Sequence, residues 1–181
     1  MQIRIADIKD NGLSLDLVEG VESFPVLQEL QGKGECLFTQ PVTVNLRAFV
    51  VSGMVEISGH VATAAEIACS RCLKPAEVAV DSRFDLTYTR ELPEVEDEGE
   101  DGSEITAEDM GLILFDGDEI DLLDAIQEQV VLALPFNPLC SRNCRGLCPQ
   151  CGADLNEQAC SCGPQDYNIK FSALKNFKVD K

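Results

Sequence analysis

The sequence predicts an α+β protein with a mostly antiparallel β-sheet or partial barrel, one amphipathic helix and a cysteine-rich C-terminal lobe. Three observations support this: alternating apolar and polar residues, one apolar stripe at helical spacing, and closely paired cysteines. A chain of 181 residues is long enough for one core with a small appendage. We expect a β-rich lobe (1–90), an acidic loop or linker (91–111), a strand and helix that complete the core (112–138), and the cysteine-rich lobe (139–181).

The strands are predicted between residues 35 and 89. Apolar side chains alternate with polar ones along 42–48, 54–57 and 78–89. This period of two places one face of a strand toward a core. Gly53 is expected at the turn between the first two runs, so these segments favour antiparallel neighbours.

Residues 112–138 are predicted to supply one more strand, Leu112–Phe115, and the clearest helix. Asp121 is the expected N-cap and Pro135 the stop signal. Residues 22–31 allow a second, short helix. The apolar stripe of the main helix is typical of core packing; its members are Leu123, Ile126, Val130 and Leu134.

The net charge of −18 is concentrated in one block of the chain. Residues 1–90 hold 8 basic and 12 acidic side chains, residues 91–131 hold 0 and 16, and residues 132–181 hold 6 and 4. Phosphates are repelled by such an acidic block, so only the C-terminal lobe suits RNA. The charged start of the chain and the absence of a long apolar run predict a cytoplasmic protein that does not enter a membrane.

Eight of the nine cysteines form four close pairs. In a reducing compartment, such pairs are typical of metal ligands, and four thiolates complete one tetrahedral zinc site. We therefore predict two structural Zn²⁺ ions in a zinc-ribbon-like lobe, while Cys36 is expected to be a small buried residue and His60 structural or exposed. The predicted ligands are Cys69, Cys72, Cys140, Cys144, Cys148, Cys151, Cys160 and Cys162.

Two pairings of the cysteines are open at this point. Cys148 and Cys151 with Cys160 and Cys162 would enclose a short loop that is inexpensive to close, which leaves Cys69/Cys72 with Cys140/Cys144. The competing arrangement places residues 140, 144, 148 and 151 around one ion. Cys144-x3-Cys148-x2-Cys151 also has the spacing of an iron–sulfur motif, although no α/β repeat follows it.

Four basic residues flank the predicted clamp between the lobes: Arg71, Lys74, Arg142 and Arg145. They would offset the negative charge of the thiolates, and we also consider them as a small basic face for RNA phosphate.

The sequence resembles the YceD family, the bacterial large-ribosomal-RNA-subunit accumulation proteins. The resemblance lies in Cys69–Pro75, in Ile120–Leu122 with Leu132–Pro135, and in the run Pro138–Asn156. Residues 171–177 resemble the closing short helix of the family. Membership implies a role in maintaining large-subunit (23S) ribosomal RNA, by a mechanism that the resemblance does not specify.

The predicted function is therefore a non-enzymatic ribosome biogenesis factor without a small-molecule substrate. Its expected partners are precursor ribosomal RNA, a basic ribosomal protein that the acidic block could shield, or both. The alternatives are a metal-dependent enzyme of RNA processing and a thiol redox protein that uses a C-x2-C pair. The first lacks a recognisable carboxylate constellation, and the second lacks a βαβ setting.

Overall fold

The main sheet consists of six strands in an open arrangement. The structure is a computed structural model, and it describes residues 1–92 and 111–162. The strand order is β2-β4-β5-β6-β7, with β3 beside the upper part of β5, and all neighbours are antiparallel except the pair β6 and β7. The mostly antiparallel sheet is thus confirmed, in its open form and not as a barrel. The strands are β2 (Leu13–Glu19), β3 (Leu37–Phe38), β4 (Val42–Val51), β5 (Met54–Ala68), β6 (Pro75–Thr89) and β7 (Leu112–Leu114).

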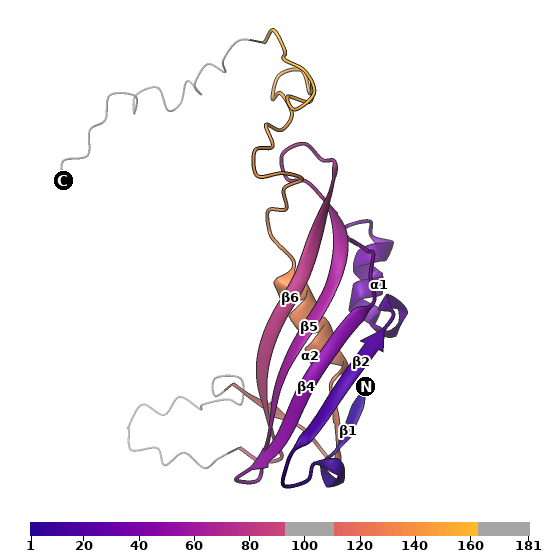
Figure 1. Cartoon of the computed structure of the whole chain (residues 1–181), viewed down its shortest axis with the longest axis vertical. Helices are drawn as coiled ribbons and strands as arrows, with labels where there is room; N and C mark the ends of the chain where they lie inside the picture. The colour runs from indigo at the N-terminus through magenta and orange to yellow at the C-terminus, as the bar shows by residue number, and fades with distance from the viewer. Residues whose placement is uncertain (93–110, 163–181) are drawn as a thin grey trace, which may run out of the picture.

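Two consecutive hairpins form the centre of the sheet (Figure 1). β4 turns into β5 through Ser52 and Gly53, with φ of 52° and 84°, as a two-residue hairpin turn requires. β5 then pairs with β6 from Val55 opposite Tyr88 to Ala68 opposite Pro75. Because β4 pairs with β5 only as far as residue 62, the β5–β6 hairpin extends beyond β4 and carries its turn, residues 69–74, to the segment that follows α2 (Figure 1).

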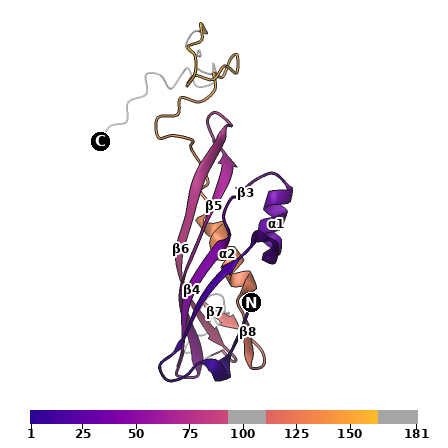
Figure 2. The same ribbon diagram turned by 45° about the vertical axis from the view of Figure 1, so that its right-hand side comes forward.

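The two helices cover one face of the sheet (Figure 2). The α1 helix spans Pro25–Gly32 and α2 spans Leu123–Ala133. The amide oxygen of Gln127 accepts a hydrogen bond of 3.2 Å from the backbone of Val26, which joins α2 to the start of α1. Between the helices and the sheet lies the core, whose largest fully buried side chains include Phe24, Leu27, Ile57, Ile120, Leu122, Ile126 and Val130.

Asp121, the predicted N-cap of the main helix, lies one residue before the N-cap position, which Leu122 occupies. Asp121 is the last residue of strand β8 (Glu119–Asp121), and its carboxylate accepts a hydrogen bond of 2.9 Å from the backbone N–H of Leu123. The helix ends at Ala133, and the following residue is already extended before Pro135. The pKa of Asp121 is lowered, first by the Leu123 N–H. Asp121 therefore caps the helix although it lies outside it.

The short helix expected at residues 22–31 is present as α1, but local patterns did not predict β1, β2 or the 3-10 turns. β1 (Gln2–Arg4) pairs with β8 in a separate two-stranded sheet, and 3-10 turns follow at Ile5–Asp7 and Val21–Ser23. β2 does show the period of two, because Leu13, Leu15 and Leu17 alternate with more exposed residues. Cys36 is buried as expected, with 4% of its surface exposed.

Most of the acidic segment 91–111 and the expected short helix at residues 171–177 lie outside the described residues. Within residues 1–92 and 111–162, no helix combines the length and the apolar character that a membrane span needs. The described part of the cysteine-rich lobe contains one isolated bridge, Leu147 opposite Asp154, and no strand or helix. Its zinc-ribbon-like character stays a prediction.

Candidate metal centre

The structure gathers eight cysteines into two groups of four. Within each group all four sulfur atoms lie within 4.8 Å of one another. This grouping agrees with the first of the two expected pairings. Because Cys144 lies in a different group from Cys148 and Cys151, the structure does not assemble the competing set or the iron–sulfur triad. The groups are Cys69, Cys72, Cys140 and Cys144, and Cys148, Cys151, Cys160 and Cys162.

The first group is built on the turn of the β5–β6 hairpin. The Cys69 N–H donates to the carbonyl of Lys74 at 2.8 Å, and the Leu73 N–H donates to the carbonyl of Cys69 at 2.9 Å. Leu73 adopts a left-handed φ of 62°, which reverses the chain and turns the sulfurs of residues 69 and 72 to the same side. Cys69 is completely buried and Cys144 nearly so, at 0% and 2% exposure.

The second half of this group comes from the segment after α2, which docks on the hairpin turn. The Ser70 N–H donates to the carbonyl of Pro138 at 2.8 Å, and the Leu147 N–H donates to the carbonyl of Arg71 at 3.0 Å. Gly146 has φ +74°, and a Cβ atom there would lie 2.9 Å from the Arg71 carbonyl oxygen. A glycine is therefore required where the two chain segments touch.

The sulfur–sulfur distances in the first group suit a common metal ion. The sulfurs of Cys69 and Cys144 are 3.8 Å apart, and those of Cys72 and Cys140 are 3.5 Å apart. A disulfide would bring two sulfurs to about 2.05 Å. Four thiolates at about 2.3 Å from one tetrahedral ion lie about 3.8 Å from each other. The donor set and its spacing therefore fit a metal ion.

Backbone N–H groups favour the thiolate form of one cysteine in each group. Hydrogen bonds from backbone N–H groups, first that of Cys140, lower the pKa of Cys69 to about 6. The N–H groups of Cys151 and Gln150 similarly lower the pKa of Cys148 to about 6. The pKa of Cys162 is raised to about 12, first by its hydrogen bond with Cys151 and then by burial. Gathering four thiolates thus needs a compensating cation.

The second group is more local and more exposed. The Cys148 N–H donates to the carbonyl of Ala153 at 2.8 Å, and the Gly152 N–H donates back to the carbonyl of Cys148 at 2.8 Å. Gly152 has φ +72° and allows this tight turn. Cys151 is exposed, whereas Cys160 and Cys162 are half-buried. This group thus depends on one short loop.

The loop between the cysteines of the second group also supports the first. Asn156 donates through Nδ2 to the Cys144 sulfur at 3.4 Å, and its Oδ1 accepts from the Arg145 N–H at 2.7 Å. Sequence reasoning assigned no role to Asn156 or to Asp154, whose carboxylate lies 2.7 Å from the Lys74 ammonium. The signal that could have identified them is the presence of two polar turn-forming residues, Asp154 and Asn156, in a loop between cysteines.

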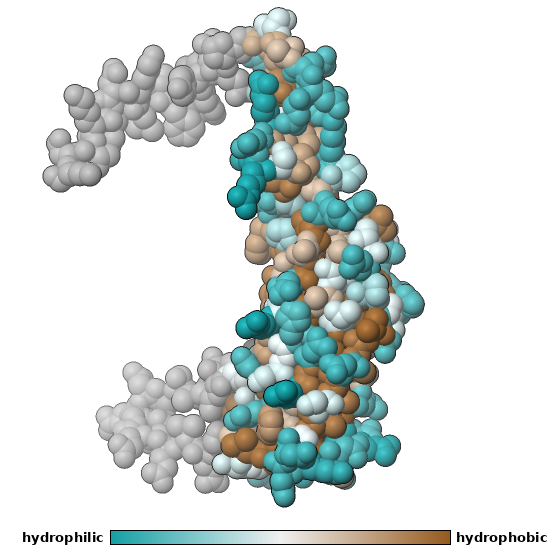
Figure 3. Space-filling view, viewed as in Figure 1, coloured by the Kyte–Doolittle hydropathy of each residue, from teal (hydrophilic) through white to brown (hydrophobic). Residues whose placement is uncertain are grey.

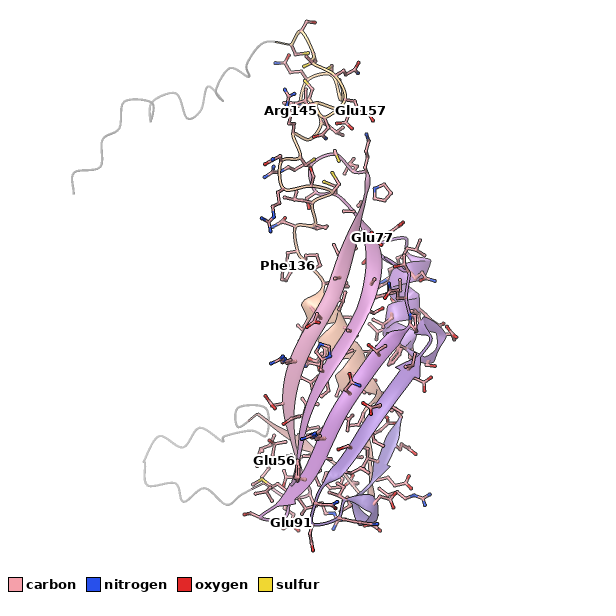
Figure 4. The ribbon with its side chains drawn as sticks, in the orientation of Figure 1. Glu56, Glu77, Glu91, Phe136, Arg145 and Glu157 are labelled. Carbon is pink, nitrogen blue, oxygen red and sulfur yellow. The ribbon has the colours of Figure 1, made fainter. Side chains whose placement is uncertain are left out.

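The four basic residues predicted near this centre have different surroundings. Lys74 forms ion pairs with Asp154 and Glu157, which raise its pKa, and Arg71 donates through Nη1 to the Cys144 carbonyl at 2.7 Å. The side chains of Arg142 and Arg145 are exposed. Neither forms an ion pair with any residue in the described ranges. Figure 4 shows Arg145 and Glu157 near the end of the cysteine lobe.

Comparison with protein families matches residues 57–178 to the family described as "Large ribosomal RNA subunit accumulation protein YceD". The match covers more than half of the chain. The chain belongs to the YceD family. All eight paired cysteines fall inside the matched YceD region, whereas β1 to β4 precede it.

Individual YceD relatives occur in plants, and similar uncharacterized proteins occur in mycobacteria. The chain is 28% identical over 156 residues to the chloroplastic "Large ribosomal RNA subunit accumulation protein YCED homolog 1" of Arabidopsis thaliana, covering 76% of this chain and 49% of the relative. The Zea mays protein of the same description is 29% identical over 146 residues, with shares of 70% and 50%. An uncharacterized protein of Mycobacterium tuberculosis (strain ATCC 25618 / H37Rv) is 40% identical over 113 residues, with shares of 62% and 50%.

The chain spans about half the length of the curated relatives it matches. No solved structure matches the chain.

Proposed function

We propose that the protein is a non-enzymatic ribosome biogenesis factor of the cytoplasm that promotes accumulation of large-subunit (23S) ribosomal RNA. It would act by binding precursor ribosomal RNA, a basic ribosomal protein, or both. The observation that carries this proposal is the YceD match over residues 57–178. The names of the two plant relatives refer to accumulation of the same subunit's RNA.

The two cysteine groups would each hold one structural Zn²⁺ ion. Soft thiolate ligands in a tetrahedral set favour zinc, and bound zinc would supply folding energy by fixing the cysteine lobe. In the first group, the ion would join the β5–β6 hairpin to the segment that follows α2. Native mass spectrometry should therefore detect two zinc ions per chain, and a chelator should remove them with loss of ordered structure in residues 139–162.

The donor sets support a binding role over catalysis. Four thiolates fill the coordination sphere of a zinc ion, so no position stays open for water or substrate. A redox role would require thiols that cycle through a disulfide. A chain that contains no metal and forms a reversible disulfide under oxidation would overturn the zinc proposal, and a brown, absorbing preparation would indicate an iron–sulfur protein instead.

The cellular role can be tested by removing the protein and measuring the ratio of large-subunit to small-subunit ribosomal RNA. We expect this ratio to fall, and we expect the wild-type chain to restore it. A variant with Cys69→Ser and Cys140→Ser should fail to restore the ratio. An unchanged ratio in cells that lack the protein would contradict the proposed function.

The two classes of partner can be separated by crosslinking in cells. Sequencing of crosslinked RNA should recover large-subunit ribosomal RNA if binding to RNA is direct. A basic ribosomal protein would instead be attracted by the sixteen acidic residues of 91–131. Deletion of residues 94–104 should then weaken protein crosslinks and leave RNA crosslinks unchanged.

A further inference from the structure

Phe136 has no packing partner among the described residues. Its side chain is 100% exposed, whereas the next most exposed large apolar residues, Val18 and Leu73, reach 67%. A phenylalanine ring left in water forgoes the favourable free energy of burying its apolar surface. Phe136 follows Pro135 in the segment that leads from α2 to Cys140, so its ring stands beside the base of the cysteine lobe (Figure 4).

The nearest exposed cations along the chain are Arg142 and Arg145. Neither of these guanidinium groups is neutralised by a carboxylate within the described part of the chain. The two other basic residues of this region differ, because Lys74 is held by Asp154 and Glu157 and Arg71 bonds the Cys144 carbonyl. Lys74 and Arg71 therefore have partners within the protein, whereas the side chains of Arg142 and Arg145 face solvent.

Phe136, Arg142 and Arg145 belong to the segment after α2, which is held in place by contacts at residues 140, 144 and 145. Cys140 and Cys144 join the first cysteine group, and the Arg145 N–H is bonded to Asn156 at 2.7 Å. Figure 4 shows Phe136 at the lower end of the lobe and Arg145 near its upper end, and Figure 3 shows strongly hydrophilic residues along the edge between those levels. Phe136, Arg142 and Arg145 thus follow one another along the segment that leads from α2 into the cysteine-rich lobe.

We propose that Phe136, Arg142 and Arg145 form a binding strip for a single-stranded segment of RNA. A base stacks on the Phe136 ring, and the two guanidinium groups contact phosphates further along the same strand. Stacking requires an unpaired base, and two cations are too few to hold a duplex by its backbone. This inference rests on the RNA-binding half of the proposed function and names the residues and the class of RNA.

The test is the affinity of the zinc-loaded full chain for an unstructured oligoribonucleotide, measured by fluorescence anisotropy at several salt concentrations. Phe136→Leu should weaken binding on the order of tenfold, because one stacked base contributes about 1–3 kcal/mol. It should leave the salt dependence unchanged. Arg142→Gln with Arg145→Gln should reduce the slope of log affinity against log salt by about 1.4, or about 0.7 for each lost phosphate contact.

The matched control is Arg47→Gln with Arg83→Gln, which removes the same charge from exposed positions in β4 and β6. It should change neither affinity nor slope by a comparable amount. Circular dichroism and the zinc content of all variants should equal those of the wild type.

Three results would overturn the strip. If the wild type binds RNA and the strip variants bind equally well, the strip is wrong and the proposed function stands. If the control double variant weakens binding as much as the strip variant, only the overall charge matters. If the wild type binds no RNA, the RNA-binding half of the proposed function fails together with the strip; retention of an acidic peptide through Arg142 and Arg145 would then identify a protein partner.

Discussion

The two groups contain four cysteines each but are assembled differently. In the first, Cys72 and Cys140 are 68 positions apart, and three of the four cysteines are buried, at 0% to 4% exposure. The second spans only residues 148–162, and its single buried member is Cys148. The first group joins distant elements of the fold, whereas the second closes a loop.

This difference has an energetic consequence. Closing the long connection of the first group costs about 2 kcal/mol more in chain entropy than closing the loop between Cys151 and Cys160. The first group is helped by hydrogen bonds between the hairpin turn and residues 138–147, and by apolar contacts with Ala76, Leu139 and Leu147. The local group forms from sequence neighbours, while the distant group depends on a folded sheet.

Loss of one cysteine from each group should give the largest contrast. Cys69→Ser should abolish the proposed first metal site, release the cysteine-rich lobe from the hairpin and lower the free energy of unfolding by more than about 4 kcal/mol. Cys162→Ser should remove one ion but affect mainly its own loop. Native mass spectrometry and thermal melting check both variants, and equal losses of Tm would contradict the comparison.

Alanine at the two left-handed glycines of the cysteine-rich lobe, Gly146 and Gly152, should give the next largest effect. Gly146→Ala forces a Cβ atom against the Arg71 carbonyl in addition to backbone strain, so we expect a loss of about 3 kcal/mol. At Gly152 nothing lies within 4 Å of an added Cβ, and strain alone should cost about 1 kcal/mol. Denaturant unfolding measures the difference, which would disappear if the contact with Arg71 were unimportant.

Asn156→Ala should weaken the first metal site although the residue lies in the loop of the second. Loss of the hydrogen bond to the Cys144 sulfur should lower metal affinity by about tenfold or more, since outer hydrogen bonds orient metal ligands. Chelator competition measures the affinity of each site. Gln158→Ala is the control, because Gln158 bonds this loop through its backbone N–H to the Asp154 carbonyl. An unchanged first site in Asn156→Ala would show that the two groups are independent.

Lys74→Gln should have the smallest effect. The ion pair with Asp154 lowers the pKa of that carboxylate and raises that of Lys74. Its contribution is therefore present above the ordinary Asp pKa of 3.8 and below the ordinary Lys pKa of 10.5, and is lost as pH passes beyond either folded-state pKa. We expect a small drop in Tm at neutral pH that shrinks in high salt. A drop that does not depend on salt would assign Lys74 a packing role.

Much of the sheet was predictable because its signal is local. The alternation along β4, the turn at Gly53 and the apolar stripe of the helix before Pro135 are all patterns of residues that are close together in the sequence. The parallel pairing of β7 with β6 and the pairing of β1 with β8 connect distant segments, and no short pattern encodes them. Whether the sheet stays open or closes into a barrel likewise depends on whether its edge strands pair with each other, which no local pattern encodes.

The cysteine centre shows the same division. Spacing alone identified all eight cysteines of the two groups and favoured the local set, because a short loop closes at little entropic cost. It could not assign Asn156 to Cys144 or Lys74 to Asp154, since side-chain partners depend on where the loops dock. The exposure of Phe136 could not be predicted from the sequence, because full exposure is a property of the folded surface.

The sequence by itself determined the strand and helix periodicities, the concentration of acid in residues 91–131 and the set of paired cysteines. These are properties of neighbouring residues and of composition. Only the tertiary structure decided that the β5–β6 hairpin carries Cys69 and Cys72 to meet Cys140 and Cys144. It also decided which cations are used internally, because Arg71 and Cys144 are 73 positions apart, Lys74 and Glu157 are 83 positions apart, and both contacts exist only after folding has brought the segments together.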